Sequence, residues 1–460
     1  MNTSPRPRTL RLSSLAVASL AVLVSGSALA VERVPPIWLN APAMLKVSTQ
    51  LGEAAPPVAV AASGPTPESL EQMYFAGRYG DVGTQGLQWL NAQPPQPDSA
   101  LRLKIANSLA WSNRLDAAIA QYEELVSSTD QAAAARLPLA NAYRWSGRVD
   151  RSLPLYERAV QDDPKSTDAA DGLEYAQREL RPRTTVQLAT SKDSGDLRIH
   201  SGTVTHRWRD ASLQQIYEVE GDLRNNQQGP VGPNPRHRGV TLRYENVGLA
   251  WKPLVTLDIQ GNPRSGVYGA VKVKLGDLPV HVDVARENFG VTAASAKALE
   301  AGITANRIGL EGSWSHSAAV LSGRVNFYDI SDNNTLRTAS IKLSPTWRPL
   351  GPAFKPYVSI DTRDVKFNTP NYWSPLEGSG SFGLGAIAEW AEKDWFFYVA
   401  AQMGTRIYGE AGDSWSASIG GQRWLNRDTA ITVNVWGMSS IRDQARYRAH
   451  SLNVKLDRLW

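Results

Sequence analysis

The strongest constraint on this chain is an alternation of apolar and polar residues that recurs from about residue 184 to the end. The last ten residues, Ser451–Trp460, read SLNVKLDRLW, with apolar side chains at 452, 454 and 456. A period of two is that of a β-strand with one apolar and one polar face. A strand with no turn after it must pair with a strand from earlier in the chain. We therefore expect Ser451–Trp460 to close a β-barrel.

About sixteen segments of this kind lie between Thr184 and Trp460, and the alternation is cleanest in Val271–Leu275 and Val280–Val284. A soluble sandwich could show the same pattern, so the choice depends on the connections and the aromatic residues. After residue 30, no run is long and apolar enough for a membrane-spanning helix. A membrane barrel needs no such run, because only every second residue of each strand faces lipid.

The connections alternate between long and short. If the first strand rises from the inner side, the long ones fall on outer positions, namely Asn225–His237, Asn288–Glu300, Asn368–Gly380 and Ser440–Tyr447. The inner ones are mostly short: Arg209–Ala211, Lys252-Pro253, Gly276–Pro279, Glu392–Asp394 and Asn426–Asp428, with a longer Leu350–Lys355. Long outer loops and tight inner turns are typical of outer-membrane barrels.

Tryptophans gather near the inner strand ends, as a belt at a membrane interface requires. They are Trp208, Trp251, Trp347, Trp390, Trp395, Trp424 and Trp460. The terminal strand ending in an aromatic residue is also similar to the signal read by the outer-membrane insertion machinery, with Arg458 where an apolar or aromatic residue is usual. These features predict an outer-membrane location and contact with outer-membrane lipid.

Residues 1–30 predict a secretory signal peptide. A basic start precedes the apolar run Leu15–Val24, and Ala28-Leu29-Ala30 has the small-x-small cleavage pattern with Ala28 and Ala30. Residues 31–66 are rich in Pro and Ala and show no period, so we interpret them as a linker.

Residues 67–180 show a helical pattern that repeats with an offset of 34. Ala106, Trp111 and Tyr122 recur at this offset as Ala140, Trp145 and Tyr156, and the second unit adds the packing and turn residues Tyr143, Gly147, Ala159 and Pro164. This pattern resembles the tetratricopeptide family, with Pro154 as a departure inside a helix and Thr167–Leu180 as a closing helix. We expect the aromatic residues to pack between helices. The resemblance implies a concave face that binds a periplasmic protein partner.

Catalytic chemistry has no support in the sequence. The chain has no cysteine, its six histidines lack metal-ligand spacing, and neither a GxSxG elbow nor a phosphate loop is present. We expect no enzyme activity, no cofactor, no metal and no nucleic-acid partner.

The alternation also predicts the lumen. If Val and Leu face lipid, their neighbours face inward. The candidate lumen residues that contact a polymer are Glu218, Glu220, Asp222, Asp258, Lys272, Lys274, Asp283, Arg324, Lys342, Asp361, Arg363, Tyr398 and Trp436. About sixteen strands leave room for an aqueous channel, and aromatic faces beside charged groups suit sugar rings.

The order of signal peptide, tetratricopeptide units and barrel resembles the outer-membrane exopolysaccharide export proteins of the poly-N-acetylglucosamine and cellulose type, here with a shortened helical part. Tyr372-Trp373-Ser374-Pro375 is similar to the Tyr-Phe-Ser-Pro motif of that group. The resemblance implies polysaccharide export through the barrel, with repeats in the periplasm that guide polymer or dock a partner. We expect Tyr372, Trp373, Ser374 and Pro375 to form an exit loop.

The predicted fold is therefore α+β and multidomain. A short tetratricopeptide-repeat domain (67–180) precedes a transmembrane antiparallel β-barrel of about sixteen strands (181–460). An alternative is an outer-membrane receptor or anchor of the phage-adsorption type, in which the long loops act. The chain has a net charge of +5, and its basic excess belongs to the barrel part, which favours a neutral or acidic polymer that contacts Lys272, Lys274 and Lys342.

Overall fold

The computed structural model describes residues 64–92, 98–112, 114–128, 130–262, 264–276, 278–315, 318–345, 350, 353–392, 394–442 and 444–460. The predicted signal peptide with Ala28 and Ala30, most of the linker, and Trp347 of the predicted tryptophan belt lie outside these residues.

The first part of the fold is a run of helices in which each packs mainly on the next. They are α1 (Pro67–Phe75), α2 (Tyr79–Ala92), α3 (Ser99–Trp111), α4 (Leu115–Ser128), α5 (Ala132–Trp145), α6 (Val149–Asp162) and α7 (Thr167–Leu180). The sequence sets their ends: Thr66 and Ser69 form a capping box at α1, and Gly147 has a φ of 82° after α5. Pro154 lies inside α6, which continues to Asp162.

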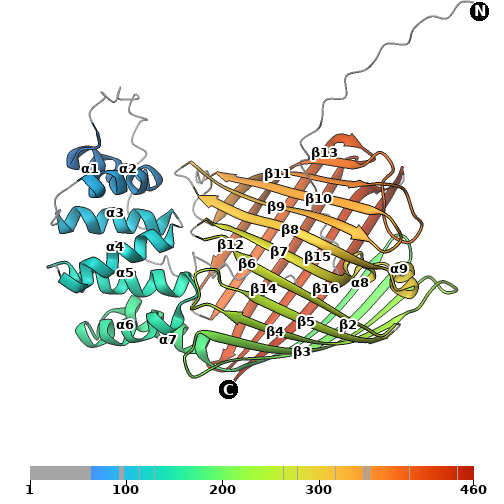
Figure 1. The fold of residues 1–460 in the computed structure, drawn as a ribbon, viewed down its shortest axis with the longest axis horizontal. Helices are drawn as coiled ribbons and strands as arrows, with labels where there is room; N and C mark the ends of the chain where they lie inside the picture. The colour runs from blue at the N-terminus through green and yellow to red at the C-terminus, as the bar shows by residue number, and fades with distance from the viewer. Residues whose placement is uncertain are drawn as a thin grey trace, which may run out of the picture.

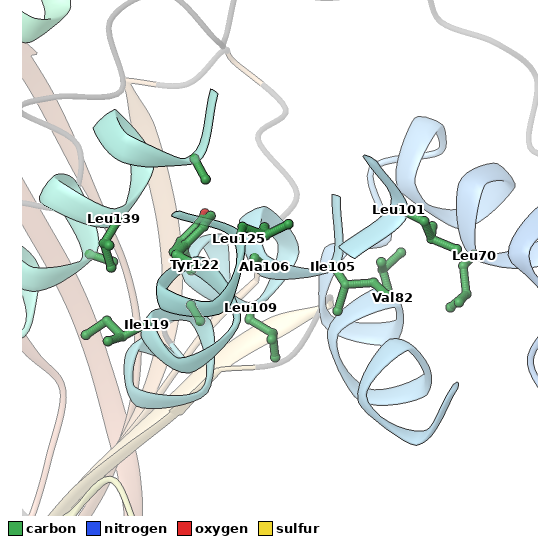
Figure 2. Packing of buried hydrophobic residues seen from close by; sticks show 14 of the residues in the cluster. Leu70, Val82, Leu101, Ile105, Ala106, Leu109, Ile119, Tyr122, Leu125 and Leu139 are labelled. Carbon is green, nitrogen blue, oxygen red and sulfur yellow. The ribbon is translucent and has the colours of Figure 1, made fainter. Parts of the chain in front are cut away.

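Apolar side chains from successive helices form a continuous core between them (Figure 2). Tyr122 and Tyr156, which are 34 residues apart, are both fully buried, and their hydroxyls donate to Asn107 (2.7 Å) and Asn141 (2.6 Å). Because the two asparagines are also 34 residues apart, the repeat in sequence is a repeat of contacts. This part of the chain is called the helical domain below.

The other residues predicted to pack in the repeats differ in burial. Ala106, Ala140 and Tyr143 are buried. Trp111, Trp145 and Ala159 are partly buried, and Pro164 is exposed in the turn between α6 and α7.

Sixteen antiparallel strands of the described residues form a closed barrel in chain order, with β1 paired to both β2 and β16. They are β1 (Arg183–Asp193), β2 (Leu197–Arg209), β3 (Gln215–Gln228), β4 (Arg236–Asn246), β5 (Leu254–Asn262), β6 (Gly266–Lys274), β7 (Val280–Asn288), β8 (Thr304–Ser315), β9 (Ala319–Ile330), β10 (Thr335–Pro345), β11 (Phe354–Val365), β12 (Ser379–Ala391), β13 (Trp395–Gly409), β14 (Ser414–Asn426), β15 (Thr429–Arg442) and β16 (Ala445–Leu459). The predicted fold class is confirmed.

Two of the predicted long loops were wrong in extent. Asn225–His237 is a shorter connection than predicted, since β3 continues to Gln228 and β4 begins at Arg236. Ser440–Tyr447 is mostly β15 and β16. Polar residues continue these strands because their backbone pairs with the neighbouring strand, which hydrophobic alternation does not reveal. The connection after β7 contains two short helices that were not predicted, α8 (Phe289–Thr292) and α9 (Ala296–Ala301).

The outward face of the barrel is apolar. Leu188, Leu223, Val267, Leu384 and Met403 are each more than 60% exposed, and they come from strands around the whole barrel. A polypeptide in water rarely exposes so much contiguous apolar surface, whereas a bilayer requires it. No helix among the described residues is both long and apolar enough to cross a bilayer.

The helical domain stands beside one end of the barrel, and α8 and α9 lie at the opposite end (Figure 1). We call these the helical end and the far end. The turns after β2, β4, β6 and β14 and the C-terminus lie at the helical end, and the connections after β3, β7 and β11 lie at the far end.

Candidate transport lumen

The strand register defines which side chains face the lumen. On each strand the exposed Val, Leu and Ile alternate with residues that face inward, and inward residues pair with inward residues on the next strand, as Glu220 does with Thr205 and Thr241. By this register the inward face carries Glu218, Glu220, Asp222, Asp258, Lys272, Lys274, Asp283, Arg324, Lys342, Asp361, Arg363, Tyr398 and Trp436.

Charged groups on the first wall of the lumen, β2–β9, form a paired network. Arg243 lies 2.5 Å from Glu218 and 3.2 Å from Glu220. Further along the wall, Arg307 bonds to both Asp283 and Glu287. Lys272 also belongs to this network, because it lies 3.2 Å from Glu311. Since these charges neutralise one another, the wall is polar and carries little free charge.

The second wall, β10–β16 with β1, is richer in aromatic and hydroxyl groups. The Lys342 ammonium lies 3.9 Å from the centroid of the Tyr357 ring, a cation–π contact. Asp361 accepts hydrogen bonds from Ser340 (2.9 Å) and Ser359 (3.1 Å). Tyr398 and Trp436 lie on the same wall.

A cavity of about 260 Å³ opens in the first wall. Its polar lining includes Glu220, Asp222, Arg224, His237, Arg243, Asp258, Tyr268 and Arg307, and Val291 of α8 covers one side. His237 is 4% exposed and lies 2.9 Å from Asp222. The cavity thus combines hydrogen-bonding groups with one aromatic ring. The sequence indicated the carboxylates, but it did not predict Arg224 or His237 as part of a site.

Two connections turn inward at the far end of the lumen and contact each other there. Phe289 of α8 is 1% exposed and packs edge-on against Tyr328 of β9 (5.7 Å between centroids) and Tyr372 of the β11–β12 connection (4.9 Å). Phe289, Tyr328, Ile330, Leu336 and Tyr372, with neighbouring alanines, form one buried group, which we call the far-end cluster. In addition, Ser295 donates a hydrogen bond to the carbonyl of Asn371, so the two connections are joined.

The predicted exit-loop motif belongs to this packing. The Tyr372 hydroxyl donates to Asp332 (3.0 Å) and accepts from Asn334 (3.0 Å). Ser374 is 1% exposed and accepts a hydrogen bond from the backbone of Thr369 (2.7 Å). Trp373 is partly buried between strands and Pro375 is buried. The motif lies at the end that its place in the chain predicts, but it is turned into the barrel.

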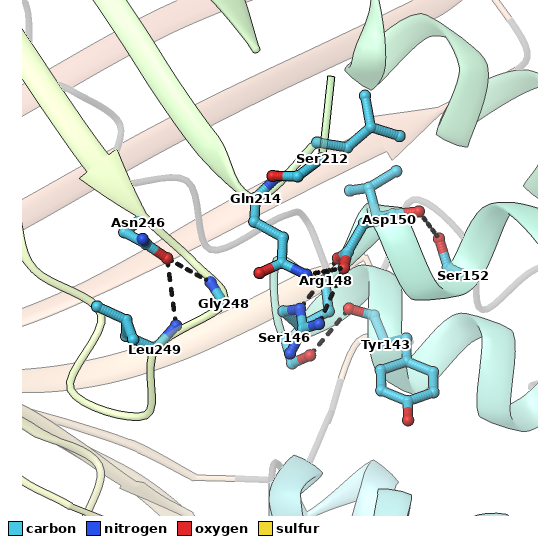
Figure 3. Close-up of polar contacts among 12 residues, drawn as sticks. Tyr143, Ser146, Arg148, Asp150, Ser152, Ser212, Gln214, Asn246, Gly248 and Leu249 are labelled. Atoms are coloured by element: carbon cyan, nitrogen blue, oxygen red, sulfur yellow. Dashed lines mark hydrogen bonds and ion pairs between the residues drawn. The ribbon is translucent and has the colours of Figure 1, made fainter. Parts of the chain in front are cut away.

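At the helical end, the helical domain contacts several turns of the barrel. Gln214 donates to Asp150 of α6 (3.3 Å), which is already held by both ends of the Arg148 guanidinium (2.9 Å each; Figure 3). Lys252 donates to the carbonyl of Ser146 (2.8 Å). Burial alone would raise the pKa of Asp150, but the hydrogen bonds and charge of Arg148 outweigh it and hold that pKa below its usual 3.8.

Two further contacts extend this docking surface in both directions. Lys274, predicted as a lumen residue, lies 2.7 Å from Asp116 of α4. On the other side the Arg178 guanidinium of α7 stacks 4.5 Å from the ring centroid of Trp424. Helices α4, α6 and α7 therefore follow the rim from β6 to β14 across the β1–β16 seam. The sequence did not indicate this docking, because single charged pairs between domains leave no periodic pattern.

Within the described part of the chain, no three His, Asp or Glu side chains come together in a way that could hold a metal ion.

No protein-family model matches the sequence, and no curated protein matches it either. Among solved structures, the chain is similar to a bacterial polysaccharide outer membrane secretin, with a TM-score of 0.49 and 12% identity over 61% of this chain and 99% of that one. It is also similar to CdiB from Acinetobacter baumannii, with a TM-score of 0.38 and 8% identity over 60% of each chain. A third likeness is to the outer membrane protein OprD from Pseudomonas aeruginosa, with a TM-score of 0.35 and 8% identity over 60% of this chain and 93% of that one. At these values none of the three bears on activity.

The barrel itself defines the class. A closed ring of sixteen strands with an apolar outside and a polar inside is a porin-like, channel-type fold. Within that class, this chain is distinguished by a helical domain docked on one rim and by two connections packed into the opposite end.

Proposed function

We propose that this chain is an outer-membrane conduit that exports a polysaccharide through the barrel. In this proposal the helical domain lies in the periplasm, where it guides the polymer or docks a protein partner. The observation that carries the proposal is the direct docking of a repeated helical domain onto the rim of a wide, polar-lined barrel through Asp116, Ser146 and Asp150. A porin for small solutes has no need of such a domain at its mouth.

The lumen chemistry supports a sugar polymer. Sugars present both hydroxyl groups and apolar ring faces, so they bind best where hydrogen-bonding side chains stand beside aromatic rings. Tyr268 borders the cavity of the first wall, and Tyr357, Tyr398 and Trp436 provide rings on the second wall. The charges around them are largely paired, which lets a polymer slide without a strong fixed attraction.

The receptor alternative requires long connections that are free at the surface. Here α8 and the Tyr372 motif are buried in the far end of the barrel. The other loop that this alternative used, Asn225–His237, is shortened to residues 229–235, because β3 and β4 include both of its ends. The geometry therefore favours the conduit.

The proposal is tested by flux through the purified full-length protein. Liposomes containing the protein should release labelled oligosaccharides once the connection between β7 and β8 is shortened by replacing residues 289–302 with a tight turn. In planar bilayers, sugars should block the current of this shortened variant. Tyr398→Ala with Trp436→Ala should shorten the blocks about thirtyfold, because each of the two stacked rings contributes about 1 kcal/mol and each 1.4 kcal/mol is about a factor of ten.

A lipid-facing control separates this effect from damage to the barrel. Trp390→Ala removes an aromatic side chain that is 51% exposed on the outward face, and it should leave the sugar blocks unchanged. A correctly folded shortened variant that passes ions but no sugar of any charge would refute export.

A further inference from the structure

Two arginines are buried on opposite sides of the lumen. Arg224 on β3 and Arg363 on β11 are each 5% exposed. Their strands are eight positions apart in a closed ring of sixteen, so the two side chains belong to facing walls. On each strand, the arginine lies close to the terminus that is located at the far end of the barrel.

Neither arginine has an acidic partner, unlike other arginines of the lumen. Arg243 and Arg307 each bond to two carboxylates. Among the described residues, by contrast, no ion pair joins Arg224 or Arg363 to a carboxylate. One terminal nitrogen of Arg224, Nη2, is buried without any hydrogen-bond partner in the described structure. A buried charge that forms no direct ion pair is unfavourable, and the surrounding structure must hold it in place.

Arg224 Nε donates to the side chain of Asn226 (2.8 Å), and in addition each arginine bonds to the backbone of an inserted connection. Arg224 Nη1 donates to the carbonyl of Val291 in α8 (3.4 Å), and Arg363 Nε donates to the carbonyl of Trp373 (3.2 Å). The two connections then meet through Phe289 and Tyr372. The chain of contacts thus runs from one wall across the far end to the other.

Neutral carbonyls are weak partners for guanidinium groups. A carboxylate, sulfate or phosphate oxyanion forms shorter hydrogen bonds to arginine, with about twice the strength, and can accept two at once. An oxyanion in the lumen would therefore compete with the carbonyls of Val291 and Trp373. Arg224 lines the 260 Å³ cavity, so a group bound there lies next to it.

Carboxylates in the same cavity do not prevent this. Glu220 is bonded to Arg243 and Glu287 to Arg307, while Asp222 contacts His237. The fourth, Asp258, accepts a hydrogen bond from Gln260. Glu220, Glu287 and Asp222 thus each have a basic side chain in contact, and Arg224 is a buried cationic group of the cavity that no ion pair within the described residues joins to a carboxylate.

We propose that Arg224 and Arg363 form a latch that an acidic polysaccharide releases. Oxyanions on the polymer displace the carbonyls of Val291 and Trp373, the two connections leave the far end, and the barrel opens. The latch rests on the proposed export function and specifies an acidic polymer for it. In this proposal Arg224 and Arg363, and not Lys272 and Lys274, select the polymer by its charge. The two lysines are already paired with Glu311 and Asp116.

The first test uses the wild-type full-length protein in planar bilayers. Four oligosaccharides of equal length are added in turn: an oligogalacturonate, a sulfated malto-oligosaccharide, a neutral malto-oligosaccharide and a cationic chito-oligosaccharide. The two acidic probes should raise the open probability at least tenfold, and the other two should not. Comparison of the galacturonate with the sulfated probe distinguishes a polymer that carries carboxylates from one that carries sulfate or phosphate esters. Opening by the neutral or cationic probe to the same degree would overturn the latch.

The second test removes the charges. Arg224→Gln with Arg363→Gln should abolish the response to acidic probes, whereas Arg337→Gln, at an exposed position on β10, should keep it. A double variant that folds, judged by heat-modifiable gel mobility, and still responds would overturn the proposal.

A third variant does not depend on the arginines. Because the chain has no cysteine, Ser295→Cys with Asn371→Cys introduces one disulfide at the contact between the two connections. The oxidised protein should not respond to acidic probes, and reduction should restore the response. An oxidised protein that still opens would show that these connections are not the gate.

Failure of the latch is distinguishable from failure of export. If the variant shortened at residues 289–302 passes labelled sugar but wild type ignores acidic probes, only the latch is wrong. If the shortened variant passes no sugar, export itself is wrong.

Discussion

Truncation of Phe289 to alanine gives the sharpest prediction from the far-end cluster. The ring is 1% exposed and touches Tyr328 and Tyr372, so it joins both inserted connections to the barrel wall. Removing a buried phenylalanine ring costs about 3–5 kcal/mol. When the connections leave the far end the ring is exposed, so nearly all of this cost falls on the closed state.

A loss of about 3 kcal/mol from the closed state changes an equilibrium more than a hundredfold, because each 1.4 kcal/mol is about a factor of ten. Partial collapse of the cluster around the smaller side chain reduces this effect. We therefore expect the Phe289→Ala protein to open at least about tenfold more often than wild type without any added sugar. The measurement is the single-channel open probability in planar bilayers.

The matched control is Phe327→Ala. Phe327 is on β9 beside Tyr328, but it points outward and is 40% exposed. Its removal should leave the open probability unchanged within about twofold, as for surface substitutions. A correctly folded Phe289→Ala protein that opens no more often than this control would refute the idea that the cluster closes the lumen.

Two further predictions concern the helical domain. Gly172→Ala would place a Cβ against the buried Tyr156 ring and should lower the free energy of unfolding by about 1–3 kcal/mol. Gly83→Ala, whose Cβ would lie 3.1 Å from a flexible leucine methyl, should raise that free energy by up to about 1 kcal/mol. Far-UV circular dichroism melts of the full chain should show these opposite changes in stability. Because the pKa of Asp150 is lowered, the stabilisation from Arg148 is complete above pH 3.8 and is lost as the pH falls below it. Asp150→Asn should therefore melt lower than wild type at neutral pH and converge with it in acid, and a constant difference would contradict the assignment.

The barrel could be predicted from sequence because its physics is local. A strand between lipid and water must alternate, so the alternation identified both the strands and their inward face. The repeat of 34 was equally visible, since Tyr122 and Tyr156 occupy the same place in successive helix pairs. The identity of the polymer has no such signature.

The inward connections could not be predicted, because their packing depends on partners far apart in the chain. Phe289 and Tyr372 are buried only because strands β7 to β11 bring their connections together. Arg224 was similarly hidden, since its polar neighbours suggested a loop. The motif Tyr372–Pro375 was noted as a pattern, but no local feature of these residues indicates that they turn into the barrel.

The seam between β1 and β16 dictates an order of assembly. Thr185 donates to Asp457 (2.6 Å) across 272 positions of sequence, so this pairing has the highest closure entropy in the barrel and forms late. Arg181, which leads out of α7, bonds to Asp428 (2.7 Å) and to the carbonyl of Trp460 (3.1 Å) at the same seam. A chain interrupted before β16 would present β1 and β15 as two open edges and would also lose an anchor for its helices. Completion of the ring therefore also adds the last anchor of the helical domain, and a half-built barrel differs from a finished one both in its open edges and in the contacts that hold its helices.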